Sequence, residues 1–330
     1  MPKTEGRFLI TGAQGFLGAW VVKYLVEAGH RPCVFDISTE PKRMANLLDK
    51  DQLDRVNFIQ GDVTRAEDVN RAVAENAIDR IIHLAALQVP FCAADPPLGG
   101  WVNVVGTLNI FEAARLHAKG MKSLVYASSA AVFGPEEFYE GKRVPEGADL
   151  LPGTHYGVFK QCNEGNARVY FQTHNLSSVG LRPWALYGVG RDQGITSGLT
   201  KAIKAGVVGK PYTIKFTGGI DLQYAEDCAR IFLSCSESPR KGARIYTLRG
   251  VAMQVNEFIQ RLEQVYPKAK GLIQAEGPRM PIAYELDDSL MVKDLGEVPR
   301  TPLEEGIRRT VEIFERLHGE GRLDVGDLEV

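Results

Sequence analysis

The sequence predicts a doubly wound α/β fold, in which helices cover both faces of a mainly parallel sheet. Short runs rich in branched and aromatic residues alternate with longer helical segments through the first half of the chain. A glycine-rich turn joins the first run to the first helical segment, and an aspartate ends the second run. This alternation implies right-handed crossovers and a sheet that is buried on both faces.

Strands are expected at six runs of high β propensity. These runs are 7–11, 32–36, 56–60, 80–86, 123–129 and 177–183. Helices are expected between them, where apolar residues recur with helical periodicity, at 16–29, 66–76, 100–118 and 155–174.

The alternation becomes less regular after residue 184. Helical segments at 194–206, 225–236, 255–265 and 303–318 are separated by loops that contain glycine and proline. We therefore expect a sheet domain over 1–183 and a smaller, mainly helical portion over 184–330. A run at 244–248 is a candidate for a late strand that returns to the sheet.

Composition restricts the classes of ligand and compartment. The 330 residues are 44% hydrophobic and 24% charged, as expected of a globular protein with a large core. The net charge of −2 provides no positive excess for nucleic acid or an anionic membrane, so small molecules are the expected ligands. The five cysteines show no CxxC spacing, which indicates reduced thiols rather than a metal site or disulfides. The polar start MPKTEGR is unlike a signal peptide, so we expect a cytosolic protein.

The stretch TGAQGFLG follows the first expected strand and opens the first helix. Its glycines, Gly12, Gly15 and Gly18, fit a tight turn, a close approach to a diphosphate and a small residue where helix meets strand. The alternative is a glycine turn with no ligand. The position in the first strand–helix–strand unit favours a dinucleotide site, to which Phe16 and Leu17 also belong.

Asp36 ends the second expected strand, where a carboxylate can accept hydrogen bonds from both hydroxyls of the adenosine ribose. It would repel a 2′-phosphate, so NAD is favoured over NADP. Asp62 and Val63 follow the third strand and either flank the adenine or begin a helix. Leu84, Ala85 and Ala86 leave room for the cofactor beside the fourth strand. The preceding His83 is interpreted as a packed strand residue.

Two tyrosine–lysine pairs have the same spacing of four residues, Tyr156 with Lys160 and Tyr266 with Lys270. Residues at this spacing share one face of a helix and can act on one reacting group. Pro267 and its polar neighbours indicate a helix end at the second pair rather than a catalytic face. Spacing alone does not establish a function for the first pair.

The motifs together resemble the extended short-chain dehydrogenase/reductase superfamily, which includes NAD-dependent sugar epimerases and dehydratases. TGAQGFLG is similar to its cofactor loop, HLAA to its fourth-strand signature, and NVVGTLNIFEAA to the helix that carries a structural asparagine, here Asn103. YASSAAVFG is similar to its catalytic-serine strand and YGVFK to its tyrosine–lysine helix. The resemblance covers nearly the whole chain and implies a Rossmann-type sheet that binds NAD.

The resemblance implies a role for each residue of a catalytic set. Tyr156 would take a proton from a substrate hydroxyl as hydride leaves the same carbon for the nicotinamide. Lys160 would stabilise the phenolate with its charge and hold the nicotinamide ribose. Ser129, which lies 27 residues before Tyr156, would hydrogen-bond the substrate oxygen, with Ser128 as a supporting neighbour. Asn103, Tyr156 and Lys160 complete the expected cofactor residues.

Departures from the family pattern bear on the substrate. Ala130 and Ala131 occupy the places of the Asp-Glu pair of sugar dehydratases, so dehydration is not expected. Ala185 stands where nucleotide-sugar members have an asparagine, and Ile220 where they have an arginine. Both missing groups would bind the substrate diphosphate, although Arg191 and Lys201 are candidates to compensate.

Three functions remain open. The first is an NAD-dependent dehydrogenase that oxidises a hydroxyl of a free sugar, sugar acid or polyol. The second is a nucleotide-sugar epimerase with tightly bound NAD, and the third is a catalytically idle NAD-binding regulator. The complete set Ser129, Tyr156 and Lys160 argues against the regulator.

The substrate is expected to meet side chains beside the catalytic set. The candidates are Gln88, Ser129, Ala130, Tyr156 and Trp184, with Leu87, Val89, Ala131 and the loop 190–196 nearby. A homodimer through the helices at 100–118 and 155–174 is also expected. The apolar positions Val104, Leu108, Phe111, Phe159, Val169 and Phe171 fit that contact and equally fit packing against the sheet.

Overall fold

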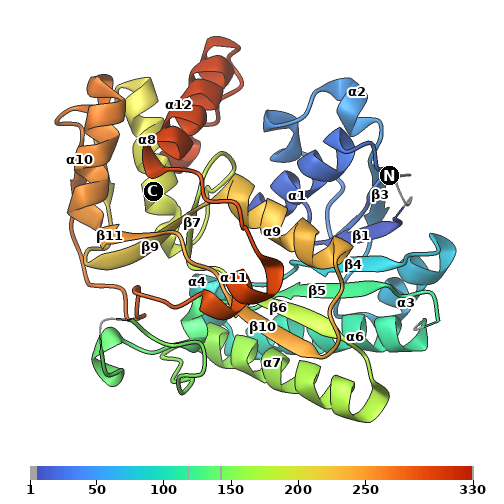
Figure 1. The fold of residues 1–330 in the computed structure, drawn as a ribbon. Coiled ribbons are helices and arrows are strands. Elements are labelled where there is room, and N and C mark those ends of the chain that lie inside the picture. The colour runs from blue at the N-terminus through green and yellow to red at the C-terminus, as the bar shows by residue number, and fades with distance from the viewer. Residues whose placement is uncertain (1–5, 118, 142, 329–330) are drawn as a thin grey trace.

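The computed structural model describes residues 6–117, 119–141 and 143–328 (Figure 1). The polar segment 1–5 and position 118, the end of an expected helix, lie outside the described residues. Of the part that is described, no helix is both long and apolar enough to cross a membrane.

A seven-stranded parallel sheet forms the centre of the molecule and confirms the doubly wound fold. Its order is β10-β6-β5-β4-β1-β2-β3. The strands are β1 Phe8–Thr11, β2 Cys33–Asp36, β3 Asn57–Gln60, β4 Arg80–His83, β5 Ser123–Ala127, β6 Ser178–Arg182 and β10 Ala243–Thr247. The strand order reverses between β1 and β4, and ligands of such sheets bind beyond the carboxyl ends of the strands at this point.

Helices cover both faces of this sheet (Figure 1). One layer contains α1 Phe16–Glu27 and α9 Ala225–Glu237, which pack against each other. The other contains α3 Ala66–Glu75, α6 Gly106–Leu116 and α7 His155–His174. Trp20 of α1 lies in the hydrophobic core of the first layer and Phe111 of α6 in that of the second, because the central strands β1 and β4 are buried on both faces.

Residues after β6 build a second group of elements beside the sheet (Figure 1). Its helices include α8 Gly198–Val208, α10 Val255–Val265, α11 Ser289–Leu295 and α12 Leu303–Gly319. A three-stranded sheet combines β7 Ala185–Tyr187, β9 Gly219–Tyr224 and β11 Val251–Gln254, and a two-stranded sheet combines β8 Tyr212–Ile214 and β12 Ile273–Ala275. The late strand β10 leaves this group and pairs in parallel with β6.

Several expected boundaries are wrong, most of them at the ends of the strands. The fourth strand ends at His83 rather than 86, and the fifth at Ala127 rather than 129. The apolar and small residues that follow line a cavity instead of continuing the ladder. The five short strands outside the main sheet were not expected from the sequence, because their runs are brief and their pairing is set by distant segments.

The helix expected at 100–118 is present but contains a π-helical turn. It begins as α5 Pro96–Gly100, passes through a π-helical turn at Trp101–Val105 and continues as α6. Short helices α2 Lys50–Leu53 and α4 Val89–Ala94 were also not expected. A π-helical turn commonly marks a functional region. Here it carries Asn103 beneath the loop that follows β4.

Candidate active site

A cavity of about 750 Å³ lies beyond the carboxyl ends of the central strands. Thirteen of the fourteen sequence-predicted cofactor residues line it. They are Gly12, Gly15, Phe16, Leu17, Gly18, Asp36, Asp62, Val63, Leu84, Ala85, Ala86, Tyr156 and Lys160. The predicted substrate residues Gln88, Ser129, Ala130, Tyr156 and Trp184 line it as well. The fold therefore brings these residues together, although they come from widely separated parts of the chain.

Close backbone packing explains the glycine loop. Gly12 has φ +67°, and a Cβ there would lie 2.5 Å from the backbone nitrogen of Ala85. A Cβ at Gly18 would lie 2.4 Å from Cα of Ala13, so α1 packs directly on the loop. The N–H of Gly15 donates to the Gly12 carbonyl at 3.0 Å. The loop aims the positive end of α1 into the cavity, where a diphosphate would be stabilised.

Asp36 ends β2 at the cavity wall, and its carboxylate accepts a hydrogen bond from the N–H of Gln14 at 3.0 Å. Burial raises the pKa of Asp36, while backbone hydrogen bonds from Gln14, Ile37 and Ser38 lower it. Its place beside the glycine loop fits the predicted ribose contact. Ile37, which is 71% exposed, lines the cavity beside it and was not predicted.

Asp62 and Val63 fit both interpretations that the sequence left open. The Asp62 carboxylate accepts hydrogen bonds from the N–H and the hydroxyl of Thr64, both at 2.8 Å, and so organises the turn before α3. Val63 is buried against Gly106, where an added Cβ would meet its Cγ2 at 2.9 Å. Both residues also line the cavity.

Asn103 lies behind the cavity wall rather than on it. Its Oδ1 accepts from the N–H of Leu87 at 2.9 Å, and its Nδ2 donates to the Leu87 carbonyl at 3.0 Å. The side chain is completely buried. A direct contact of Asn103 with the cofactor does not fit this position, because both ends of the amide hold the loop after β4.

His83 is also held away from the reacting groups. Its Nδ1 lies 2.6 Å from the Thr11 hydroxyl and its Nε2 lies 3.0 Å from the Thr107 hydroxyl. Burial, with a smaller contribution from the charge of Lys160, lowers the pKa of His83 to about 3. The imidazole is therefore neutral at physiological pH, in agreement with a structural role.

The start of α7 brings the tyrosine and lysine to the cavity. The Thr154 hydroxyl caps this helix by accepting the N–H of Gly157 at 3.1 Å. A Cβ at Gly157 would lie 2.2 Å from the Ala131 carbonyl, so the helix rests directly on the turn after Ser129. Lys160 is 3% exposed and its Nζ donates to the Ala127 carbonyl at 2.7 Å. The same ammonium lies 5.5 Å from the centre of the Tyr156 ring.

Burial and charge set the proton affinities of this pair. Burial lowers the pKa of Lys160 to about 8. Burial also raises the pKa of Tyr156, while a hydrogen bond with Ser129 and the charge of Arg191 lower it. The phenol of the unliganded protein is therefore protonated at neutral pH. It becomes a base only when more positive charge stabilises the phenolate.

Ser129 and Ser128 face different partners. Ser129 accepts the N–H of Ala131 at 3.1 Å and lines the cavity. Ser128 donates to Glu164 at 2.5 Å, and Arg182 donates to both oxygens of the same carboxylate at 2.7 and 2.6 Å. This buried network joins β5, β6 and α7 below the site. Glu164 was not identified from the sequence, because an isolated helical glutamate has no distinguishing local pattern.

Residues from the second half complete the cavity. Trp184 donates its indole N–H to the Ala283 carbonyl at 2.8 Å, so the ring is held as part of the wall. Arg43, Met280 and Ile282 also line the cavity and were not predicted. Arg43 reaches across 149 positions of sequence to bind Asp192. Local sequence contains no signal for a contact over that separation.

The two substituted family positions lie outside the cavity. Ala185 and Ile220 are completely buried in the hydrophobic core. Lys201, a candidate to compensate for them, does not line the cavity among the described residues, whereas Arg191 does. Of the two candidates to compensate, Arg191 is therefore the one placed to meet a substrate in this cavity.

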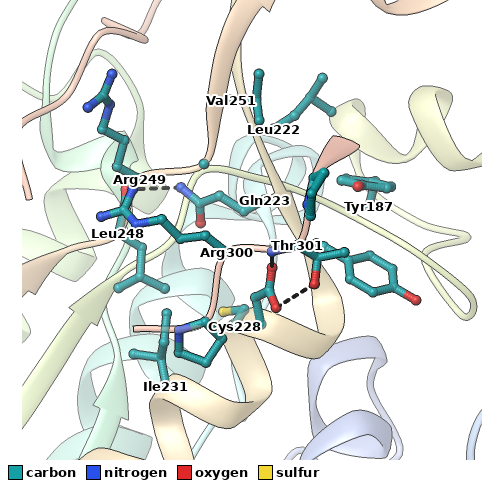
Figure 2. A pocket seen from close by; sticks show the side chains of 15 residues that line it. Tyr187, Leu222, Gln223, Cys228, Ile231, Leu248, Arg249, Val251, Arg300 and Thr301 are labelled. Carbon is teal, nitrogen blue, oxygen red and sulfur yellow. Dashed lines mark hydrogen bonds between the residues drawn. The ribbon is translucent and has the colours of Figure 1, made fainter. Parts of the chain in front are cut away.

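A second cavity of about 160 Å³ lies between α9 and the segment 299–302 (Figure 2). Asp227 accepts hydrogen bonds from the N–H and the hydroxyl of Thr301 at 2.6 and 2.8 Å, and Figure 2 shows this contact beside the buried thiol of Cys228. The residues that line it include none of the sequence-predicted catalytic or cofactor residues. The contact between Asp227 and Thr301 holds the segment 299–302 against α9.

Comparisons with known proteins identify the family and the fold. The model of the NAD dependent epimerase/dehydratase family matches residues 8–248. A UDP-glucose 4-epimerase of Mycolicibacterium smegmatis is 28% identical over 93% of this chain and 98% of that protein. The solved UDP-glucose 4-epimerase of Thermus thermophilus, a complex with NAD, is 28% identical with a TM-score of 0.77, covering 93% and 98% of the two chains. An L-threonine dehydrogenase of Cupriavidus necator has the same fold, with a TM-score of 0.80 and 22% identity over 93% and 99%.

Proposed function

The chain belongs to the NAD-dependent epimerase/dehydratase family, and on this premise we propose that it is a nucleotide-sugar epimerase that acts by transient oxidation of its substrate. It is an NAD-dependent enzyme, and NAD when bound supplies the hydride acceptor. The observation that carries the proposal is the similarity to a UDP-glucose 4-epimerase over 93% of this chain and 98% of that protein. This corrects the order of the hypotheses from the sequence, which placed a free-sugar dehydrogenase first.

In the proposed reaction Tyr156 is the general base. Its phenolate would take the proton of a substrate hydroxyl, and the resulting phenol would return it after the carbon centre has been reduced from the opposite face. Ser129 would donate its hydroxyl to the substrate oxygen and so hold that oxygen beside the phenol. Lys160, 5.5 Å from the phenol ring centre, would lower the pKa of Tyr156 when it is protonated.

The cofactor would lie across the glycine loop with its adenosine ribose on Asp36. The residues at this end of the cavity fit NAD, because the N-terminus of α1 opens into the cavity and can bind a diphosphate. Gly12 keeps the loop in place, since a Cβ there would collide with the backbone of Ala85. Lys160 reaches the same cavity and is placed to bind the second ribose. Asp62 and Val63 would border the adenine.

A second candidate is an NAD-dependent dehydrogenase that acts on a free sugar, sugar acid or polyol. It is favoured by the substitution at positions 185 and 220. The asparagine and arginine that the family resemblance implies for diphosphate binding are replaced by apolar residues buried in the core. Two lost polar contacts would weaken binding of a nucleotide diphosphate by several kcal/mol, at roughly 1.5–3 kcal/mol each.

The two candidates differ in their balance of NADH. The purified protein should be incubated with UDP- and dTDP-sugars, with the products separated by chromatography and the absorbance of NADH followed over time. Conversion of a nucleotide sugar without accumulation of NADH supports the epimerase. Accumulation of NADH with a free sugar, sugar acid or polyol, and no conversion of any nucleotide sugar, overturns it in favour of the dehydrogenase.

We also propose that residues 1–183 bind NAD and carry the catalytic set while 184–330 supply most of the substrate contacts, and that the protein is a homodimer. Phe111 is buried in the core and packs within the subunit. Trp101, Val158 and Val169 are 55%, 46% and 50% exposed on or beside the two helices expected to pair. A monomeric mass by light scattering at micromolar concentration contradicts the dimer.

A further inference from the structure

Arg191 has an incomplete set of partners at the cavity wall. Its Nη2 donates to the Thr196 hydroxyl at 3.0 Å, and its Nη1 donates to Oε1 of Gln88 at 3.4 Å, which is a long hydrogen bond. Its Nε is buried and has no hydrogen-bond partner. A guanidinium has five N–H donors, so most of this group's capacity is unused.

No carboxylate of the described residues forms an ion pair with this guanidinium. The neighbouring Asp192 is bound by Arg43 instead, with contacts at 2.7, 3.0 and 3.2 Å. Burial lowers the pKa of Arg191 to about 10, so the group remains charged at neutral pH. A partly buried cation without a counter-ion costs free energy, and an anion that enters the cavity would offset that cost.

Arg191 occupies the space around the reacting phenol. Its positive charge lowers the pKa of Tyr156, and its guanidinium carbon lies 5.8 Å from the centre of the Phe16 ring. Gln88, which follows β4, and Thr196, which precedes α8, accept its two hydrogen bonds, and all three residues line the cavity. The guanidinium, on the loop expected to meet the substrate, therefore lines the same cavity as Ser129, Tyr156 and Lys160.

We propose that Arg191 is a specificity-determining residue that binds an anionic group of the substrate close to the hydroxyl on which Tyr156 acts. This proposal rests on the proposed function, because it assigns the substrate class of the same site. The shared chemistry is that of a planar or tetrahedral oxyanion, which a guanidinium binds through two parallel hydrogen bonds. Its two possible sources are a carboxylate on the sugar and the diphosphate of a nucleotide sugar.

The variants Arg191→Gln and Arg191→Lys test the assignment, with Arg249→Gln as the matched control. Arg249 also has a buried Nε without a partner, but it lines the smaller cavity (Figure 2). The probes are glucuronate, galacturonate and gluconate against glucose, galactose and sorbitol, together with UDP-glucose and UDP-glucuronate. NAD affinity is measured separately by titration calorimetry.

We expect the wild type to prefer anionic probes, and Arg191→Gln to raise KM for them about 10- to 100-fold with a smaller change in kcat. Arg191→Lys should recover part of this loss, while Arg249→Gln should leave KM unchanged. Loss of preference for uronates identifies a carboxylate, and loss confined to nucleotide sugars identifies the diphosphate. A tenfold or greater loss of NAD affinity in Arg191→Gln, or unchanged selectivity between anionic and neutral probes, overturns the proposal.

A binding readout separates this proposal from the proposed epimerase activity. The melting temperature of the NAD-loaded wild type should rise with millimolar anionic probe and not with its neutral counterpart, whether or not turnover follows. If the protein does not epimerise a nucleotide sugar but its melting temperature still rises with an anionic probe, the epimerase proposal is contradicted and this inference stands. Epimerisation without any dependence on Arg191 contradicts this inference alone. If Arg191→Gln does not fold, the wild-type selectivity and Arg191→Lys still decide the outcome.

Discussion

Two tyrosine–lysine pairs with the same spacing lie in different environments. Tyr156 and Lys160 begin α7 at the wall of the large cavity, with Lys160 buried and a hydrogen bond between Tyr156 and Ser129. Tyr266 follows the last residue of α10, and its hydroxyl donates to Glu315 at 2.8 Å. Lys270 is exposed.

The difference shows that a spacing of four residues allows a tyrosine and a lysine to act together but does not make them do so. Burial and the carboxylate of Glu315 raise the pKa of Tyr266, while Lys268 lowers it. At Tyr156 the hydrogen bond with Ser129 and the charge of Arg191 lower the pKa against the effect of burial. The net pKa of both tyrosines is raised, but of the two only Tyr156 lines the large cavity, where a bound cofactor would add positive charge.

The largest expected effect comes from removing one hydroxyl from each pair. Tyr156→Phe should reduce turnover by about 10³-fold or more, because general-base catalysis contributes roughly 10²–10⁴, while NAD binding by calorimetry should change little. Tyr266→Phe should leave turnover unchanged and reduce the free energy of unfolding by about 1 kcal/mol through loss of the hydrogen bond to Glu315. Equal loss of activity in the two variants would refute the contrast.

The next test displaces the catalytic helix without changing either pair. Gly157→Ala places a Cβ 2.2 Å from the Ala131 carbonyl, so α7 must shift away from Ser129. We expect a loss of roughly 2 kcal/mol of stability, in the range of overpacked sites, and a lower kcat at unchanged NAD affinity.

Gly165→Ala is the matched control, because a Cβ at Gly165 in the same helix meets no atom within 4 Å. It should raise the free energy of unfolding by up to about 1 kcal/mol through helix propensity. Chemical denaturation measures both variants. Equal kcat in the two glycine variants would show that close packing at Gly157 does not position the site.

The third test uses the buried ammonium and its dependence on pH. The pKa of Lys160 is about 8 in the folded chain against an ordinary value of 10.5, so the unfolded chain binds more protons between these values. This group therefore makes stability rise with pH from about 8 to 10.5 and disfavours the folded state below pH 8.

Lys160→Met should accordingly be more stable than the wild type at pH 7, by about 3 kcal/mol, and the difference should vanish above pH 10.5. Turnover should fall at the same time, because Tyr156 loses the charge that favours its phenolate. Lys270→Met, at the exposed position, should show no pH-dependent difference. Urea denaturation of the unliganded proteins at neutral pH and at about pH 10.5 measures the contrast, and a pH-independent difference for Lys160→Met would contradict it.

The smallest expected effect concerns the second pair alone. Glu315→Gln removes a charge that raises the pKa of Tyr266, so that pKa should move toward its ordinary value of 10.0. Ultraviolet difference titration against the Tyr266→Phe variant isolates the signal. Activity should be unchanged, because Glu315 lies on α12, outside the large cavity.

Local sequence patterns were sufficient to predict elements whose signals all lie within one short stretch of the chain. The bounds of α7 and α10 agree with the expected 155–174 and 255–265, because caps and apolar periodicity are contained within each helix. The glycine loop was found in the same way. Helical residues also run from Pro96 to Leu116, close to the expected 100–118, but the π-helical turn within them was not predicted, because it depends on what Asn103 and its neighbours contact rather than on propensity.

By itself the sequence predicted the doubly wound fold, which the structure confirms, and it identified the glycine turn and Asp36 from residue types at short, fixed separations and the proposed catalytic trio from the family resemblance. Only the tertiary structure decided that Asn103 stands behind the cavity, that Glu164 joins Ser128 to Arg182, and that Arg191 lies near Tyr156 without an acidic partner among the described residues. The contact between Ser128 and Glu164, for example, joins residues 36 positions apart. Burial and charge at such contacts depend on tertiary packing, which no local sequence pattern encodes.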